Sequence, residues 1–417
     1  MFTFKILTVL ASLIVLCSTR ILPNKLIQVN SYENSNSIGT PCSTNISNAY
    51  VDIYLIIDVS ANMGAANLRQ IGLSLSSELT TVPIAGLDDP HTSRVSIITY
   101  DETVNVLANV TELNSHADVS NVLLSLKVSN SSSAAGIEDA FFAADAMMID
   151  CWIDMNCGIN RQQAFVFIGA SMNGVNTSSL IKTASEMNLR QSWITINWNN
   201  KDATLKQVFD KIATPSFNLS NTDKNVYEEF LWALTQTNCY CPGDPYQLFG
   251  YNTAKNRYER FVDCYMDSEF IGYGNTSVSN LCLLEDGFTN SAITSAIKHD
   301  FIRNRLINSF NESGENYFPD HYYNGLHRNN QSKWMWFDYD SSEFALGNFT
   351  AWYPGYTEKS PGNCVKAQLQ PSSNNYLWMT TSCFSDNATL VCQTLGCDAD
   401  RTNCITPLKK KKYHLKI

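Results

Sequence analysis

The feature that most constrains this chain is a regular alternation of short apolar runs and helical stripes across its first half. Four runs are rich in Ile and Val and are typical of strands buried on both faces of a sheet: DIYLIID (52–58), RVSIITY (94–100), AFVFIG (164–169) and SWITINW (192–198). Five other segments carry apolar residues at helical spacing: 67–82, 136–149, 178–189, 202–213 and 226–234. This alternation predicts an α/β doubly wound domain whose ligands bind at the carboxyl ends of mostly parallel strands.

The first of these strands ends on a carboxylate. Hydroxyl and amide side chains follow Asp58 in the stretch DVSANMG. Carboxylate, hydroxyl and amide oxygens are ligands for hard cations, so a cation site can begin in this way. No G-x-G-x-x-G follows the strand, and this absence disfavours a nucleotide-binding domain.

Four stretches, in this order, resemble a von Willebrand factor A domain: DIYLIIDVSANMG, RVSIITYDETVNV, SSSAAGIEDAF and AFVFIGASMNG. The resemblance predicts a domain over 42–238. The metal signature of this family is Asp-x-Ser-x-Ser, a later Thr before a Gly-led helix, and an Asp after the fourth strand, and it implies Mg²⁺. The signature carries over to Asp58, Ser60, Asn62 in place of the second Ser, and Ser131, for which Ser132 or Ser133 are alternatives.

The late Asp of the signature is missing, because Gly169, Ala170 and Ser171 stand where it should lie. A Mg²⁺ site commonly uses one or two carboxylates. The resemblance therefore implies a degenerate site that binds Mg²⁺ weakly. The alternative is that Asp58 and Ser60 cap the first helix, since side-chain oxygens at a helix start accept hydrogen bonds from its free N–H groups.

Composition shifts at CYCPGD (239–244), after which aromatic residues become dense and a single helical segment remains, 293–307. Six stretches of this half resemble a C-type lectin-like domain: YYNGLHR, WMWFDYD, NFTAWYPGY, GNCVKAQL, LWMTTSCF and LVCQ. The resemblance implies an α+β fold over 240–395, with 323–326 standing for the family's Trp-Ile-Gly-Leu strand. It also implies three disulfides: Cys282–Cys392, Cys364–Cys383 and Cys241–Cys264.

Sugar-binding members of the lectin family hold Ca²⁺ with Glu-Pro-Asn or Gln-Pro-Asp in a long loop and with Trp-Asn-Asp on the next strand. Here Tyr356, Thr357 and Glu358 stand at the first motif, while Met379 and Thr380 replace the Asn and Asp of the second. Methionine is a poor ligand for a cation that takes six to eight oxygens, so Ca²⁺ is not expected in this domain.

Sugar binding, if it occurs, is expected through exposed aromatic faces. The candidates are Tyr353 and Tyr356, beside Glu358. The alternative is that both tyrosines only cover the loop.

Cysteine usage indicates an oxidising compartment. Thirteen cysteines less Cys17 of the N-terminal segment leave twelve, enough for six bridges. Besides the three pairs above, we expect Cys42–Cys239, Cys151–Cys157 and Cys397–Cys404, although Cys239 and Cys241 are close enough to exchange partners. The short spacing of Cys151 and Cys157 favours a local bridge over a zinc pair, because no second Cys or His pair accompanies it.

The N-terminus and the sequons point to secretion. MFTFKILTVLASLIVLCST (1–19) has the layout of a signal peptide, and no later stretch reaches membrane-spanning length. Ten N-x-S/T sequons fit an extracellular glycoprotein: Asn45, Asn109, Asn130, Asn176, Asn218, Asn275, Asn311, Asn330, Asn348 and Asn387. Of these, Asn348 is expected to be buried and bare.

The remaining segment, 396–417, holds the last bridge and a basic tail with Lys409–Lys412. This run is either solvated or a surface-charge anchor. The net charge of −10 argues against nucleic acid as a partner.

The tandem resembles secreted nematode proteins with lectin-like domains, which are linked to defence against microbes. It implies a recognition or adhesion glycoprotein that binds glycan or protein ligands on cell or microbial surfaces. The alternative is a structural extracellular matrix or adhesion protein without sugar binding. An enzyme is not expected, because none of the six histidines lies in a triad or H-E-x-x-H context and no G-x-S-x-G occurs.

Overall fold

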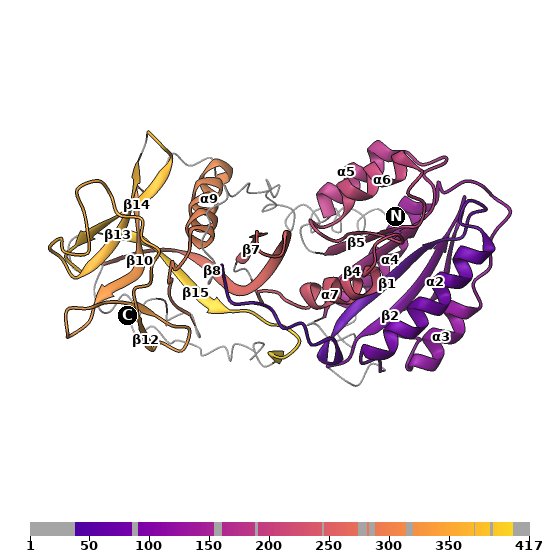
Figure 1. Ribbon diagram of the computed structural model, residues 1–417, viewed down its shortest axis with the longest axis horizontal. Coiled ribbons are helices and arrows are strands. Elements are labelled where there is room, and N and C mark those ends of the chain that lie inside the picture. Colours follow the sequence, from indigo (N-terminus) through magenta and orange to yellow (C-terminus); the bar gives the residue numbers. More distant parts are fainter. Residues whose placement is uncertain are drawn as a thin grey trace, which may run out of the picture.

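The computed structural model places two sheet-centred units side by side, with the long strands β8 and β15 extending from the second unit toward the first (Figure 1). The residues that the structure describes are 38–85, 91–153, 161–187, 191–243, 246–273, 282, 288–313, 320–370, 372–383 and 387–402. The predicted signal peptide, the basic tail and Asn275 lie outside these residues. No helix among the described residues is long and apolar enough to cross a membrane.

The first unit is built on a six-stranded sheet in the order β3-β2-β1-β4-β5-β6. Its strands are β1 (Val51–Asp58), β2 (Arg94–Tyr100), β3 (Val104–Ala108), β4 (Gln162–Gly169), β5 (Ser192–Asn197) and β6 (Asn218–Ser220). Its helices are α2 (Ala65–Glu78), α3 (His116–Leu124), α4 (Ile137–Ile153), α5 (Thr177–Met187), α6 (Ala203–Ile212) and α7 (Val226–Thr237), with short 3₁₀ turns at Ile46–Asn48 and Leu79–Thr81. All strand pairs are parallel except β2 with β3, so the predicted doubly wound α/β fold is confirmed.

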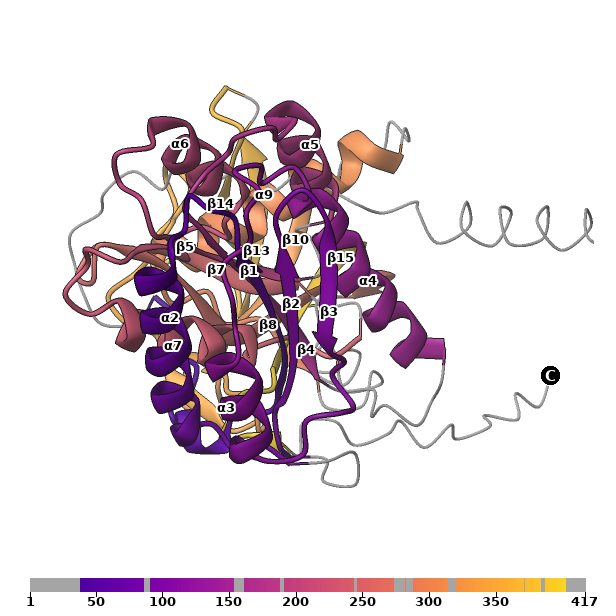
Figure 2. The same cartoon turned by 90° about the vertical axis from the view of Figure 1, so that its right-hand side faces the viewer.

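The side chains of β1 show why its sequence is apolar without interruption. Ile53, Leu55 and Ile57 pack on the side of α2, α3 and α7, whereas Tyr54 and Ile56 pack on the side of α4, α5 and α6. Figure 2 shows α2 and α3 on one side of these strands and α4 on the other. A central parallel strand covered on both faces needs apolar side chains at every position.

In the second unit, helix α9 (Ala296–Ser313) lies beside an extensive sheet. The central strand order is β12-β11-β10-β15-β8-β7, and β13, β14 and β9 join it at the side. The strands are β7 (Tyr246–Asn252), β8 (Arg257–Tyr273), β9 (Thr289–Asn290), β10 (His321–Arg328), β11 (Trp334–Phe337), β12 (Glu343–Ala345), β13 (Cys364–Gln370), β14 (Asn375–Thr381) and β15 (Asn387–Leu395). The predicted α+β composition of this half is therefore present.

Four disulfides join described residues: Cys42–Cys239, Cys241–Cys264, Cys282–Cys392 and Cys364–Cys383. These are four of the six pairs expected from the sequence. Cys397 is also disulfide-bonded, but its expected partner Cys404 lies outside the described residues, as does Cys157. The pairs Cys151–Cys157 and Cys397–Cys404 stay predictions.

The segment 38–42 precedes the first unit in the chain but packs against the second. The carbonyl oxygen of Thr40 accepts a hydrogen bond from Val262 N at 3.0 Å, and Thr40 N donates to Asp263 Oδ2 at 2.5 Å. Cys42 then meets Cys239, with 5.9 Å between their Cα atoms. The first unit is thus inserted between this segment and the rest of the second unit, an arrangement that the sequence analysis did not predict.

Candidate functional site

Asp58, at the carboxyl end of β1, is fully buried. Its Oδ1 accepts a hydrogen bond from Ser60 N at 2.8 Å, and its Oδ2 accepts one from Ala170 N at 3.0 Å. Burial raises the pKa of this carboxyl group, although the hydrogen bonds from Ala170 and Ser60 oppose the rise. The side chain therefore ties the loop after β1 to the loop after β4.

The expectation that Asp58 and Ser60 cap the first helix is wrong. Helix α2 begins at Ala65, its N-cap residue is Gly64, and no side chain caps it. Asp58 instead closes a local turn with Ser60 N and bridges to the neighbouring strand. This long-range partner, Ala170, could not be inferred from local spacing.

The other predicted ligands lie in the same corner of the first unit. Asn62 Nδ2 donates to the carbonyl oxygen of Ser132 at 2.7 Å, and Ala61 N donates to that of Ser131 at 2.7 Å. Ser131 Oγ lies 3.4 Å from Glu102 Oε2. The sequence analysis missed Glu102, whose only signal was its place just after the second strand.

This donor set does not fit a tight Mg²⁺ site. Asp58 has the only carboxylate among the predicted ligands, and both its oxygens already accept backbone hydrogen bonds. Within the described residues, no group of three or more His, Cys, Asp or Glu side chains is placed to hold a metal ion. The residues that replace the late Asp supply a backbone N–H, from Ala170, in place of a carboxylate.

In the second unit, the long loop before β13 presents two tyrosines on a tight turn. Tyr356 N donates to the carbonyl oxygen of Tyr353 at 2.9 Å, and Gly355 between them has φ of +92°. Pro at the second turn position and a positive φ at the third are typical of a type II turn. Both rings are half-buried and meet edge to face, with 6.5 Å between centroids. Tyr353 N also donates to Trp378 O at 2.8 Å, which fixes the turn to β14.

The other end of this loop is held by a guanidinium group. Arg328 Nη2 donates to the carbonyl oxygens of Glu358, at 2.8 Å, and Ser360, at 3.0 Å. Trp334 Nε1 donates to the same Glu358 oxygen at 2.9 Å, and the Arg328 guanidinium lies 4.6 Å from the Trp334 ring centroid. Glu358 therefore contributes its backbone carbonyl oxygen to these contacts, and the residue itself is exposed to solvent. The sequence analysis missed Arg328, because only the fold brings it to this loop.

The strand that should complete a Ca²⁺ site, β14, supplies neither the amide nor the carboxylate of the family motif. Met379 is half-buried on β14 opposite Lys366 of β13, and Thr380 is buried.

Asn348, expected to be buried, is exposed, because the loop after β12 leaves it at the surface.

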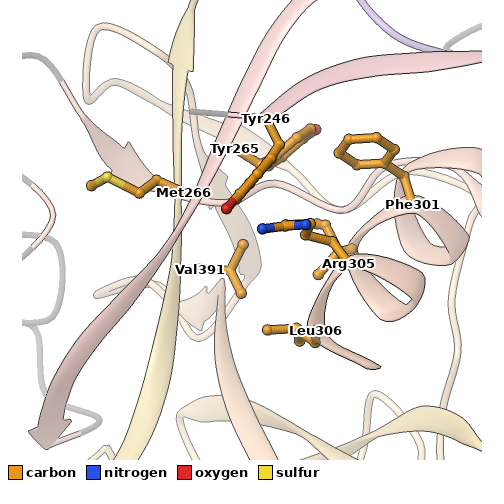
Figure 3. Close-up of a pocket in the computed structure, with 8 residues that line it drawn as sticks. Tyr246, Tyr265, Met266, Phe301, Arg305, Leu306 and Val391 are labelled. Atoms are coloured by element: carbon orange, nitrogen blue, oxygen red, sulfur yellow. The ribbon is translucent and has the colours of Figure 1, made fainter. Parts of the chain in front are cut away.

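A small apolar cavity lies between α9 and the strands β7, β8 and β15 (Figure 3). The Arg305 guanidinium lies flat on Tyr246, 3.3 Å from the ring centroid. Tyr265, Phe301 and Val391 complete most of the wall. The described side chains of the lining include no carboxylate, histidine, serine, threonine or cysteine.

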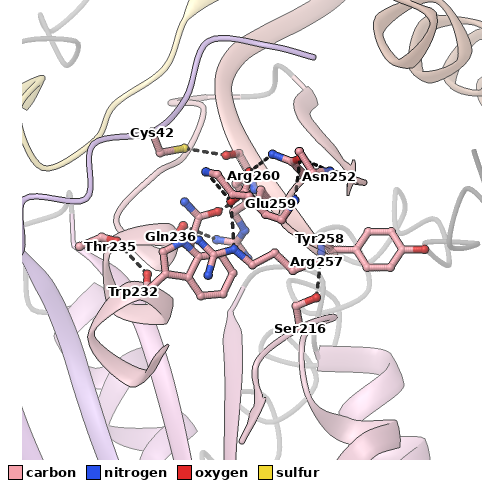
Figure 4. Close-up of polar contacts among 12 residues, drawn as sticks. Cys42, Ser216, Trp232, Thr235, Gln236, Asn252, Arg257, Tyr258, Glu259 and Arg260 are labelled. Atoms are coloured by element: carbon pink, nitrogen blue, oxygen red, sulfur yellow. Dashed lines mark hydrogen bonds and ion pairs between the residues drawn. The ribbon is translucent and has the colours of Figure 1, made fainter. Parts of the chain in front are cut away.

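The two units meet through side chains of α7 and β8 (Figure 4). The Arg257 guanidinium lies 3.8 Å from the Trp232 ring centroid, and its Nη1 is 2.9 Å from Glu229 Oε2. Arg260 N donates to Gln236 Oε1 at 2.7 Å. Glu229, Trp232 and Gln236 lie on one face of α7, since their spacing matches helical periodicity. This face is therefore fixed to the second unit.

Comparison with known proteins agrees with this architecture. Residues 52–229 match the model of the von Willebrand factor type A domain, so the first unit is such a domain, as predicted. C-type lectin domain-containing protein 160 of Caenorhabditis elegans is 22% identical over 387 residues, which cover 86% of this chain and 55% of that protein. The chain thus spans about half the length of this curated relative. These matches indicate an adhesion or recognition protein.

Two solved structures are similar to parts of this chain. A structure of proximal thread matrix protein 1 from the mussel byssus, with a zinc-occupied MIDAS motif, has a TM-score of 0.37 and 13% identity over 46% of this chain and 47% of that one. The Ca²⁺-independent C-type lectin SPL-2 of Saxidomus purpuratus has a TM-score of 0.26 and 20% identity over 37% of this chain and 92% of that one. Below, the first unit is called the A domain and the second the lectin-like unit.

Proposed function

We propose that this protein is a secreted recognition glycoprotein whose lectin-like unit binds glycans on microbial or cell surfaces, in innate defence, without Ca²⁺. The observation that carries the proposal is the type II turn that presents Tyr353 and Tyr356. An aromatic face packs against sugar C–H groups while its hydroxyl stays in water. A turn anchored to Trp378 holds both rings in place before the ligand arrives, which lowers the entropy lost on binding.

The way in which the loop is held supports independence from Ca²⁺. The carbonyl oxygens of Glu358 and Ser360 already accept hydrogen bonds from Arg328. A guanidinium is always charged and presents donors in a fixed fork, so it can order these carbonyls without an ion. In the A domain, we propose at most weak Mg²⁺ binding, because Asp58 supplies a single, buried carboxylate. From the side chains that the structure describes, we propose no enzymatic reaction.

The proposal is tested with the full secreted chain on a glycan array and by titration with the sugars that bind. We expect equal affinity in Ca²⁺ and in excess EDTA. Tyr353→Ala and Tyr356→Ala should each weaken binding, whereas Tyr251→Ala, at a half-buried tyrosine of the β7–β8 hairpin, should not. A signal that disappears in EDTA and returns with Ca²⁺ would show that the loop holds an ion after all.

A structural matrix or adhesion role without sugar binding is the second candidate. The observation that favours it is the junction, where a disulfide and the Arg257 contacts fix the two units together. Absence of binding to any glycan or microbial surface, together with incorporation into an insoluble matrix, would select this role.

A further inference from the structure

Two sequons lie in the loops that surround Asp58. Asn130 and Asn176 are both exposed, and they precede Ser131-Ser132 and Thr177-Ser178. Asn130 lies in the segment that leads to α4, and Asn176 lies between β4 and α5. Because β1 and β4 are parallel neighbours, the loops after them open on the same edge of the sheet.

The loops at this edge are closed over the remains of the metal signature. Ser129 N donates to Val59 O and Ala61 N donates to Ser131 O, both at 2.7 Å, so the residues on either side of Asn130 are paired with the loop after β1. On the other side, Asn173 Nδ2 donates to Ser132 O at 3.0 Å. The side chain of Asn130 is left outside this ladder.

Both asparagines can carry a glycan without losing a contact. N-glycosylation occurs on Nδ2, and Asn176 uses its other atom, Oδ1, to accept from Ser179 N at 3.2 Å at the start of α5. Neither Nδ2 donates a hydrogen bond to any described residue. By contrast, Asn45 Nδ2 donates to Asp400 and Asn218 Nδ2 donates to Asp210.

We infer that N-glycans at Asn130 and Asn176 cover the carboxyl-end edge of the A domain. An N-glycan is bulky and strongly hydrated, and two of them flank the corner that contains Asp58. This corner lacks the charge needed to recruit a cation, and the glycans exclude a protein partner from it. Recognition then falls to the lectin-like unit. The inference rests on the proposed secretory route and goes beyond it by assigning a role to two sequons.

The test uses the full chain secreted from eukaryotic cells, with glycopeptide mapping of each sequon. An amine introduced by Ala61→Lys, at an exposed position in the loop after β1, reports access for a bulky amine-reactive reagent. We expect both sites to be occupied. Labelling at position 61 should rise several-fold when Asn130→Gln and Asn176→Gln are added, while labelling of the exposed Lys359 in the other unit stays constant.

Asn330→Gln, which removes an exposed sequon of the lectin-like unit, is the matched control and should leave labelling at position 61 unchanged. Ala135→Lys, also exposed, provides a second reporter if the first variant does not fold. Bare Asn130 and Asn176 beside an occupied Asn330 would overturn the shield alone, as would labelling that does not change when occupied glycans are removed. No glycan at any sequon would overturn the shield together with the secretory route.

Discussion

A valine at position 39 should destabilise the lectin-like unit, although this position precedes the A domain in the chain. A Cβ atom added to Gly39 would lie 2.6 Å from Leu248 Cδ2, 2.8 Å from Phe261 Cγ and 2.9 Å from Asp263 Oδ2. These distances are shorter than any normal contact, so the segment 38–42 must move away from β8. Cys42 would keep it tethered to Cys239.

The magnitude follows from what the displaced segment loses. Overpacking of a well-packed site costs about 1–3 kcal/mol. The two hydrogen bonds of Thr40 contribute about 1 kcal/mol each, and more for the one to the buried Asp263 carboxylate. These two costs are not fully additive, because movement of the segment 38–42 relieves the steric clash while it breaks the hydrogen bonds. We expect a loss of about 2–4 kcal/mol in the unfolding free energy of the lectin-like unit.

Hydrogen–deuterium exchange resolved by peptide distinguishes destabilisation of the lectin-like unit from destabilisation of the A domain. In Gly39→Val, amides of β10 and β13 should exchange faster, while those of β1 and β4 should keep the wild-type rate. Gly347→Val is the control, because no atom lies within 4 Å of a Cβ added there. Faster exchange confined to the A domain, or none in either unit, would refute the assignment of the segment 38–42 to the lectin-like fold.

Three further outcomes are expected. Arg328→Lys should speed amide exchange in the long loop and weaken ligand binding, with no rescue by Ca²⁺, because an ammonium lacks the planar fork that spans two carbonyl groups; unchanged exchange would argue against the clamp. Burial raises the pKa of Asp58, so the stability that its protonated form contributes is present at low pH and is lost as pH rises through the raised pKa. Asp58→Asn should remove this component of the pH profile of A-domain unfolding. Calorimetry showing micromolar or tighter Mg²⁺ binding by the unaltered chain would implicate Glu102 as the missing ligand. Arg257→Gln should loosen α7 from the lectin-like unit, by about 1–2 kcal/mol for the lost cation–π and ion-pair contacts, seen as faster exchange in α7 with β1 unchanged.

The first half was predictable because its signals are local. Apolar runs of six or seven residues and stripes at helical spacing indicate a covered parallel sheet, and β1, β2, β4 and β5 lie where those runs predicted. Helix α3 and strand β3 were missed, since α3 is only nine residues long and β3 exposes its three central residues. Weak amphipathic patterns of this kind cannot be told from loops by periodicity alone.

The contacts that shape the candidate sites were not predictable, because each joins residues far apart in sequence. Ala170 N reaches Asp58 over 112 positions, and Thr40 reaches Asp263 over 223. A single sequence reports residue types and spacing, and neither indicates which backbone N–H will meet a given carboxylate. The predicted ligands Asp58 and Asn62 do come together, but the partners that satisfy them are backbone groups that carry no signal in the side-chain sequence.

In both units, polar groups near a degenerate ion site are paired with groups of the protein itself, although the charges are reversed between the two. In the A domain, the negative charge of Asp58 is met by two backbone N–H groups where the family signature implies a cation. In the lectin-like unit, the carbonyl oxygens of Glu358 and Ser360, in the loop that contains the positions of the first Ca²⁺ motif, accept hydrogen bonds from the Arg328 guanidinium. Buried or loop-ordering polar groups must find partners, since an unpartnered one costs about 1–3 kcal/mol. Because backbone and side-chain groups of the protein supply these partners, both loops should keep their conformation when divalent ions are removed. A chelator should therefore leave amide exchange unchanged at either site.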